Sequence, residues 1–322
     1  MKHTHLLVLA LGAAILGGCN GGDTKSASNE GGSSANNKRV FTIGVSQCNL
    51  GEPYRAQMNK DIAEAAKNHD ELKLVFKDAQ NDSLKQRDQV EEFVQDKVDA
   101  LIISPKEAQP LTEPVAKAVD AGIPVIVLDR AVLGDKYTCF IGADNKVIGK
   151  ALGQWLAKRF PDGANVVELK GLMTSPPAQD RHSGFLEGTA GSKLKVVFDA
   201  DMKWLEPNAR TEMESALARV PKIDAVFAHN DPGAHGAYLA AQAAGKEKGI
   251  VFVGIDGLPQ EGRVYVQQGI EEASFEYPTG GAQAIDTVLK ILHKEQVPKK
   301  ITLPSKFFTK DNVAKGGEPI QP

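Results

Sequence analysis

Short apolar runs alternate with longer amphipathic segments from residue 39 onward. Four nearly continuous runs rich in Val, Ile and Leu predict strands covered on both faces, at 40–46, 72–76, 100–104 and 124–128. Apolar positions at helical spacing predict helices between them, at 54–68, 83–97 and 111–121, with Ser83 as an N-cap. Strand–helix repeats of this length are typical of a doubly wound parallel sheet.

The same alternation starts again after residue 160. A second set of strands is expected at 165–169, 194–198, 225–228 and 250–255, with helices between them at 177–189, 207–219 and 232–244. Three further elements are expected: helices at 146–160 and 280–294 and a strand at 301–303. A chain of this length usually exceeds one core. The predicted fold class is therefore α/β, with two similar doubly wound parallel-sheet lobes.

The first 38 residues follow a different pattern. A basic start and the apolar run 6–16 lead to Leu16-Gly17-Gly18-Cys19, and the run is shorter than the about 20 residues that span a bilayer. Residues 1–19 therefore predict a secretory signal peptide. Its ending resembles a bacterial lipobox, so Cys19 is the expected lipidation site, although an ordinary signal peptide with a chance Cys is the alternative. Residues 20–38 hold no large apolar residue and predict a disordered tether.

Composition argues against several classes of function. The net charge of −3 does not favour nucleic-acid binding, which usually needs a basic surface. No metal-ligand spacing and no nucleophile elbow appear, so neither a metal nor a cofactor is expected. After Cys19 only Cys48 and Cys139 remain. They could pair in an oxidising compartment, but two free or buried thiols are the expectation.

Charged and amide side chains gather at the ends of the predicted strands. Ligands of open parallel sheets bind beyond the carboxyl ends of the strands, so these side chains mark a candidate site. Carboxylates and amides accept hydrogen bonds from sugar hydroxyls, an Arg fork donates to two oxygens, and aromatic faces such as those of Tyr54 and Trp204 cover a sugar ring. The polar candidates are Gln47, Glu52, Arg55, Asp129, Arg130, Asp180, Arg181, His229, Asn230, Asp231 and Asp256.

Each candidate also has a simpler explanation. Asp129 and Arg130 could form a surface salt bridge. Asp256 could cap a helix that begins near Pro259. Asn230 and Asp231 could both cap the helix that begins at Pro232, and Asp231 is the expected cap. Trp155 is expected in the core rather than on the ligand, and His182 and His229 are expected behind the site or facing solvent rather than in a catalytic role. Five polar clusters at strand ends favour a binding site for a neutral polyol.

Five motifs in order resemble the type I periplasmic sugar-binding proteins, especially the ribose and galactofuranose-binding members of bacterial ABC importers. The motifs are Leu128-Asp129-Arg130, 142–145 with Gly149, 180–185, 228–231 and 254–257, and the resemblance covers about 39–305. It implies a hinge of three crossovers near 141–144, 273–276 and 302–305. The implied N-terminal lobe is 39–143 plus 275–302, and the C-terminal lobe is 144–274 plus 303–322.

The resemblance also implies roles for the candidates. Asp129 and Arg130 would bind ligand from the first lobe, and Trp204 would stack on it. Arg55 replaces an aromatic residue of ribose binders, while Glu276 stands where they have Gln. Both departures resemble the galactofuranose-binding subgroup, and an Arg55–Glu276 charge pair in the cleft would favour a hexose, in the pyranose or the furanose form, over ribose. The remaining implied contacts are Glu52, Tyr54, Arg181, Asn230 and Asp256.

The expected protein is a monomeric solute-binding lipoprotein in the periplasm or at the cell surface, anchored through Cys19. It would capture a monosaccharide, hexose or pentose, between closing lobes and deliver it to an ABC permease. Presentation of the sugar to a chemoreceptor or sensor kinase is the alternative, and three Arg residues leave an acidic sugar open. A repressor of this fold would need an N-terminal helix-turn-helix. A glycosidase using Asp129 and Asp256 would need a general acid, which nearby Arg residues disfavour.

Overall fold

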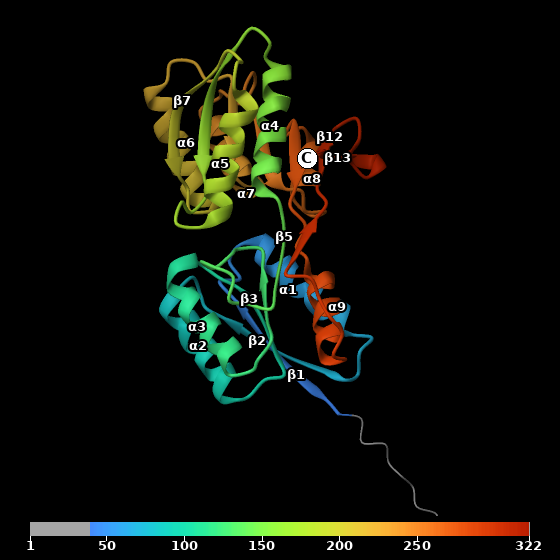
Figure 1. Ribbon diagram of the computed structural model, residues 1–322. Coiled ribbons are helices and arrows are strands. Elements are labelled where there is room, and N and C mark those ends of the chain that lie inside the picture. Colours follow the sequence, from blue (N-terminus) through green and yellow to red (C-terminus); the bar gives the residue numbers. More distant parts are fainter. Residues whose placement is uncertain (1–38, 322) are drawn as a thin grey trace, which may run out of the picture. The chain divides into compact units, whose positions relative to one another are not determined.

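The first lobe is built on a six-stranded parallel sheet in a computed structural model that describes residues 39–321. The spatial order is β2-β1-β3-β4-β5-β11. Figure 1 shows α2 and α3 together on one face and α1 with α9 on the other. The strands are β1 (Phe41–Gln47), β2 (Leu72–Asp78), β3 (Ala100–Ser104), β4 (Val125–Leu128), β5 (Cys139–Ala143) and β11 (Lys300–Leu303). The helices are α1 (Pro53–Ala66), α2 (Ser83–Gln95), α3 (Ala108–Asp120) and α9 (Gly281–Leu292).

The second lobe repeats this order, β7-β6-β8-β9-β10, and then adds β12 and β13. The sheet is parallel up to β10, whereas β12 is antiparallel to its neighbours on both sides. The strands are β6 (Ala164–Lys170), β7 (Leu194–Asp201), β8 (Ala225–Ala228), β9 (Val251–Asp256), β10 (Ala273–Glu276), β12 (Lys306–Thr309) and β13 (Glu318–Pro319). The helices are α4 (Asn145–Arg159), α5 (Pro176–Thr189), α6 (Glu206–Arg219), α7 (Asp231–Ala243), α8 (Gly262–Gln268) and a 3₁₀ turn, Val313–Lys315.

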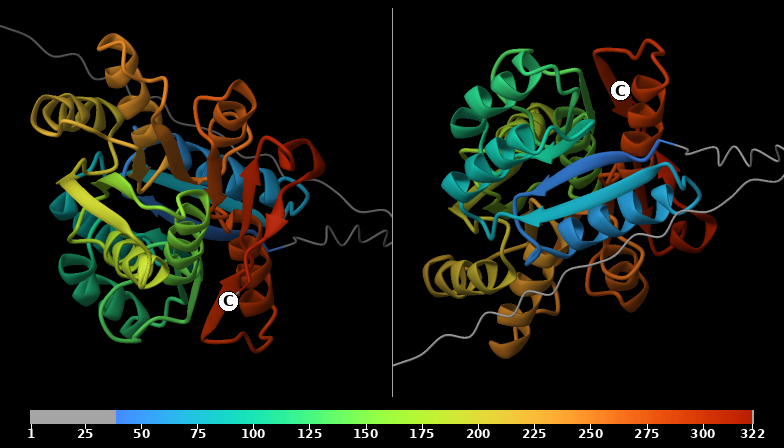
Figure 2. Two further views of the ribbon diagram at one scale, coloured as in Figure 1. Left: turned by 90° about the horizontal axis from the view of Figure 1, so that it is seen from above. Right: turned by 90° about the horizontal axis from the view of Figure 1, so that it is seen from below.

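Three segments carry the chain from one lobe to the other. The first links β5 to α4, the second links β10 to α9, and the third links β11 to β12. Figure 2 shows the two sheets from above and below, with β1 beside β2 in the first lobe and β7 at the edge of the second. The predicted fold class, two parallel-sheet α/β lobes joined by three segments, is confirmed.

Strand order explains where a site can form. In both lobes the first strand of the unit lies between the second and the third, so the helices on either side of it diverge at its carboxyl end. A crevice opens at such a switch point. β3 and β4 are buried along their whole length, which accounts for their continuous Val, Ile and Leu runs. The candidate residues that follow these strands are therefore placed by a rigid sheet.

The predicted strands and helices are confirmed, but four strands lack a periodic signal. β5, β10, β12 and β13 are short and carry polar or small residues, so the apolar pattern alone does not distinguish them from loops. Cys48 and Cys139 are both free and buried, as expected. Trp155 is partly buried against the hydrophobic core.

Two capping predictions are wrong, and one capping alternative is excluded. Asp82, not Ser83, caps α2 and accepts from the backbone N–H groups of the first turn. Asn230 caps α7, because the Asp231 carboxylate points back into the lobe. Asp256 caps no helix, since α8 begins only at Gly262.

Residues 39–321 contain no helix with both the length and the apolarity needed to cross a membrane. The predicted signal peptide, the lipidation site Cys19 and the predicted tether lie outside the described residues.

Candidate functional site

A cavity lies at the carboxyl ends of both sheets. The structure brings nine of the ten predicted contact residues together in its wall, with Glu276 as the exception. Residues of both lobes line it: Glu52, Tyr54, Arg55, Asp129 and Arg130 from the first, and Pro177, Arg181, Trp204, Asn230 and Asp256 from the second.

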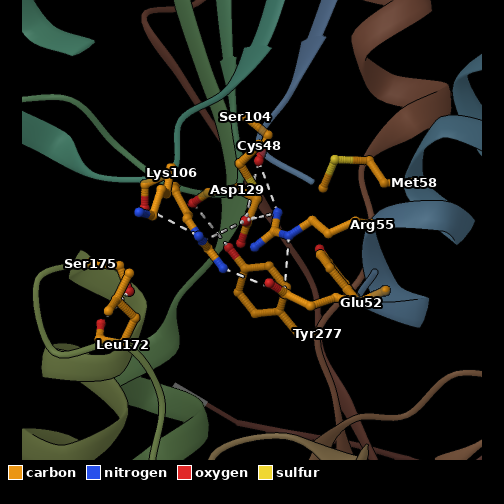
Figure 3. Close-up of polar contacts among 12 residues, drawn as sticks. Cys48, Glu52, Arg55, Met58, Ser104, Lys106, Asp129, Leu172, Ser175 and Tyr277 are labelled. Carbon is orange, nitrogen blue, oxygen red and sulfur yellow. Dashed lines mark hydrogen bonds and ion pairs between the residues drawn. The ribbon is translucent and has the colours of Figure 1, made fainter. Parts of the chain in front are cut away.

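The first-lobe side of the cavity is a buried network of charges. Arg55 Nη1 makes an ion pair with Asp129 Oδ2 and donates to Ser104 Oγ at 2.8 Å (Figure 3). Arg55 Nε lies 3.4 Å from Glu52 Oε2, and Arg130 Nη2 lies 3.5 Å from the same oxygen. Two guanidinium groups thus share two carboxylates, so none of these buried charges is isolated.

Local backbone geometry places the side chains of Asp129, Glu52 and Tyr54 in the cavity wall. Asp129 follows β4 with φ +68°, a left-handed conformation that Asp tolerates better than most residues. Glu52 precedes α1 but makes no side-chain cap, because its carboxylate accepts from Asn49 Nδ2 at 2.7 Å and pairs with the arginines. The Tyr54 hydroxyl donates to the Pro278 carbonyl at 3.1 Å, which ties α1 to the second crossover.

The second-lobe side centres on Arg181. Its Nε donates to Asn145 Oδ1 at 2.8 Å, and its Nη1 donates to the His229 carbonyl and lies 3.6 Å from Asp256 Oδ1. The guanidinium carbon lies 5.3 Å from the centre of the Trp204 ring and 5.1 Å from that of Tyr277. Arg181 is thereby fixed by both rings and hydrogen bonds.

Asp256 is the least compensated charge of the site. It is buried, has φ +136°, and its nearest cation is the one 3.6 Å away on Arg181. Burial raises the pKa of the Asp256 carboxyl well above its usual range, against the opposing effect of Arg181. A ligand hydroxyl could supply a hydrogen bond that this carboxyl lacks.

The two histidines lie behind the site, in agreement with the sequence prediction. Glu168 on β6 accepts from His182 Nδ1 at 2.8 Å and from His229 Nε2 at 3.0 Å. Burial lowers the pKa of His229, which favours the neutral ring. His229 supports Arg181 through its backbone carbonyl.

The predicted Arg55–Glu276 pair is wrong. Glu276 ends β10 and pairs with Arg263 at 2.7 Å, and it does not line the cavity. Arg55 instead uses Nε and Nη1 to bind Asp129, Glu52 and Ser104. Of the two departures from the ribose pattern, only Arg55 reaches the cavity.

Three residues near the cavity were not predicted. Ser104 ends β3 at the same sheet edge as Asp129, so the strand-end rule that found Asp129 also applies to it. Tyr277 follows β10 and packs its ring near Tyr54 and Arg181. Pro177, in the first turn of α5, carries no polar signal in the sequence.

Arginines and carboxyl groups line the cavity in equal number. Three arginines, Arg55, Arg130 and Arg181, face three carboxylates, those of Glu52, Asp129 and Asp256. Among residues 39–321, no group of three His, Cys, Asp or Glu side chains could hold a metal ion. The arrangement suits recognition of a neutral ligand with several hydroxyl groups.

Comparisons with known proteins agree with this geometry. Residues 43–296 match the family model of the periplasmic binding protein domain. The ribose import binding protein of Bacillus subtilis is 34% identical over 278 residues, which cover 86% of this chain and 90% of that protein. The galactofuranose-binding protein of Escherichia coli is 33% identical over 275 residues, covering 82% of this chain and 86% of that protein.

A solved structure is similar in both sequence and fold. The fructose-binding periplasmic domain of a hybrid two-component system superposes with a TM-score of 0.83 at 41% identity, and the match covers 86% of this chain and 93% of that one. The chain therefore belongs to the periplasmic binding proteins, as a sugar-binding protein of type I.

Proposed function

We propose that this protein binds one neutral monosaccharide between its lobes and delivers it to an ABC permease. Two unpartnered donors carry the proposal. Arg130 Nε and Trp204 Nε1 are buried without a hydrogen-bond acceptor, both residues line the cavity, and they come from opposite lobes. Buried donors without partners are costly, and sugar oxygens would satisfy both at once.

The charge balance favours a neutral sugar over a uronic acid. Each arginine of the cavity already has a carboxylate within 3.6 Å. A ligand carboxylate would therefore meet Glu52, Asp129 and Asp256 without gaining a free cation, and like charges disfavour binding. The charge balance supports a neutral sugar against the acidic alternative that three arginines leave open in the sequence.

A hexose in the furanose form is the preferred ligand class, with D-fructose as the first candidate. The relatives described above are named for ribose, galactofuranose and fructose, and the fructose-binding domain has the highest identity of the three. Arg55 replaces an aromatic wall by hydrogen-bond donors. A polar group that a smaller ligand leaves unmet costs about 1–3 kcal/mol, so ribose should bind more weakly.

A thermal-shift and calorimetry panel tests the ligand. It compares D-fructose, D-ribose, D-galactose, L-arabinose and D-galacturonate. A sugar at about 100 times its Kd should stabilise the fold by about 2.7 kcal/mol. D-fructose or another neutral hexose should give the largest shift and D-galacturonate none. A response to D-galacturonate alone, or submicromolar ribose binding with all hexoses silent, would refute the assignment.

Binding is proposed to involve closure of the lobes, with boundaries at 39–143 plus 277–303 and 144–276 plus 304–322, one or two residues from the expected ones, so that each of β10 and β11 stays within its own sheet. Contacts across the cleft support this. Thr174 Oγ1 donates to Glu107 Oε1 at 2.8 Å, and Gln260 Nε2 donates to Gln57 Oε1 at 3.3 Å. These side chains meet at the rim of the cleft, so they would separate on opening. Capture rather than catalysis is proposed, since the matched relatives are binding proteins.

Lipid anchoring through Cys19 is proposed from Leu16-Gly17-Gly18-Cys19. Cys19→Ser should release the protein from the membrane fraction or leave it unprocessed. Fractionation of the wild type with soluble proteins would contradict the anchor.

The second candidate function is presentation of the sugar to a sensor kinase. It is favoured by one observation, the similarity to a binding domain of a hybrid two-component system. Neighbouring genes for a permease or for a kinase distinguish the two outputs, whereas the sugar site would be the same.

A further inference from the structure

A pair of carboxyl groups lies behind the ligand cavity of the second lobe. Asp231 begins α7 and Glu271 precedes β10, and both are almost completely buried. Neither side chain makes an ion pair among residues 39–321, and both oxygens of Glu271 lack a hydrogen-bond donor. Two buried carboxylates without a counter-ion are unfavourable, so their arrangement needs a physical reason.

The two carboxyl groups converge on one point. A Cβ built at Gly254 on β9 would lie 2.4 Å from Asp231 Oδ1 and 3.0 Å from Glu271 Oε2. Only Gly leaves room there, and the two oxygens face the same small space. Two ionised carboxylates whose oxygens lie within 3.0 Å of one point would repel each other, whereas a proton on one of them allows a hydrogen bond to the other.

Asp231 in turn holds the backbone beside the cavity. Its Oδ2 accepts from the Gly257 N–H at 2.8 Å, and its Oδ1 accepts from Ser274 Oγ at 2.8 Å. Gly257 follows Asp256, whose φ of +136° is a conformation that non-Gly residues rarely adopt. The Asp231–Gly257 hydrogen bond therefore helps to keep the Asp256 carboxyl in the cavity wall.

We propose that Glu271 is a positioning residue for sugar binding: it carries a proton that it shares with Asp231, and the pair holds Gly257 and so Asp256 in place. The role rests on the proposed binding function. It explains why the lobe contains a carboxyl group that reaches neither ligand nor cation.

The surroundings support a protonated Glu271. The charged or titratable groups near the pair are Arg181 on α5, Asp256 on β9, and Glu261 and Tyr265 at α8, while Arg263 on α8 donates to the Gly257 carbonyl at 2.8 Å. Burial raises the pKa of Glu271 well above its usual range, and the neighbouring Asp231 raises it further. Burial also raises the pKa of Asp231, to about 6. Arg181 faces several carboxyl groups here, so retention of a proton lowers the repulsion among them.

Two substitutions of Glu271 distinguish the effect of its proton from the effect of its side-chain volume. Glu271→Gln replaces the protonated oxygen by an N–H donor of similar shape, while Glu271→Ala removes the donor. The control is Glu272→Gln, because Glu272 is the adjacent residue and pairs only with Arg159 near the surface. Infrared spectra at neutral pH report protonated carboxylic acids through their C=O stretching band.

The expected spectra differ in one carboxylic acid. Glu271→Gln should lose part of the band and Glu272→Gln should not. In calorimetry with D-fructose, Glu271→Gln should bind within about threefold of wild type and Glu271→Ala at least about tenfold more weakly. An unchanged band in Glu271→Gln, or equal affinities of Glu271→Ala and wild type, would overturn the proposal. Failure of wild type to bind D-fructose would refute that ligand, while the infrared comparison would still decide the shared proton.

Discussion

The two lobes contribute to one cavity in different ways. In the first lobe, Arg55 and Arg130 share Glu52 and Asp129, so the charged groups hold one another in place. In the second lobe, Arg181 and Asp256 are 3.6 Å apart, and the surrounding backbone, rings and carboxyl groups position them. The same strand order therefore supports two kinds of preorganisation.

The difference teaches where mutations should affect folding and where they should affect binding. Removal of one member of the first-lobe network leaves a buried charge with fewer partners, which destabilises the unliganded protein. The second-lobe side has donors and acceptors that protein groups leave unmet, such as Trp204 Nε1. Changes there should appear mainly in ligand affinity.

The largest effect is expected for Asp129→Ala in the first lobe. Arg55 would lose one of its two carboxylate partners. The remaining carboxylate, that of Glu52, is also paired with Arg130. We expect a loss of about 3–5 kcal/mol in the free energy of unfolding, together with loss of sugar binding. Chemical denaturation and calorimetry measure both. The matched control is Asp135→Ala, an exposed Asp in the same loop. Equal stability of the two variants would show that the network does not stabilise the lobe.

A smaller effect, confined to binding, is expected for Trp204→Phe in the second lobe. The substitution removes Nε1, which has no protein acceptor, and keeps an aromatic ring near Arg181. Affinity for D-fructose should fall by about 1–3 kcal/mol because a hydrogen bond to the sugar is lost. The control is Trp155→Phe, on α4 away from the cavity. Undiminished affinity of Trp204→Phe would remove Trp204 from the contact set.

The smallest effect concerns pH and Glu261. Partial burial raises the pKa of Glu261 to about 7, so the folded protein holds a proton that the unfolded chain releases at a lower pH. Stability should therefore fall as pH rises from about 4.5 to about 7 and then level off in this respect. Glu261→Gln should reduce the difference between the Tm values at pH 5 and pH 8. An identical difference in both proteins would show that Glu261 does not cause it.

The sequence predicts which residues line the cavity better than it predicts which side chains pair with one another. The positions of Asp129, Arg130 and Asp256 at strand ends predict them as site residues, because parallel strands bring their carboxyl ends to one edge of the sheet. The sequence does not show which charges pair. Glu276 meets Arg263 instead of Arg55, because its direction depends on how α8 packs beside β10. Asp231 looks like a helix cap, and only the three-dimensional arrangement shows that its carboxylate reaches Gly257 and Ser274.

Contact residues on opposite lobes provide the most direct test of the central claim, that both lobes bind one neutral sugar in this cavity. Titration calorimetry should compare wild type, Arg130→Ala and Asp256→Ala with D-fructose, with melting curves to confirm that each variant folds. The account predicts one sugar bound per wild-type chain. Each substitution should weaken binding by about 2–5 kcal/mol, because each removes a buried charged partner. Full-strength binding by either folded variant would contradict a site shared between the lobes.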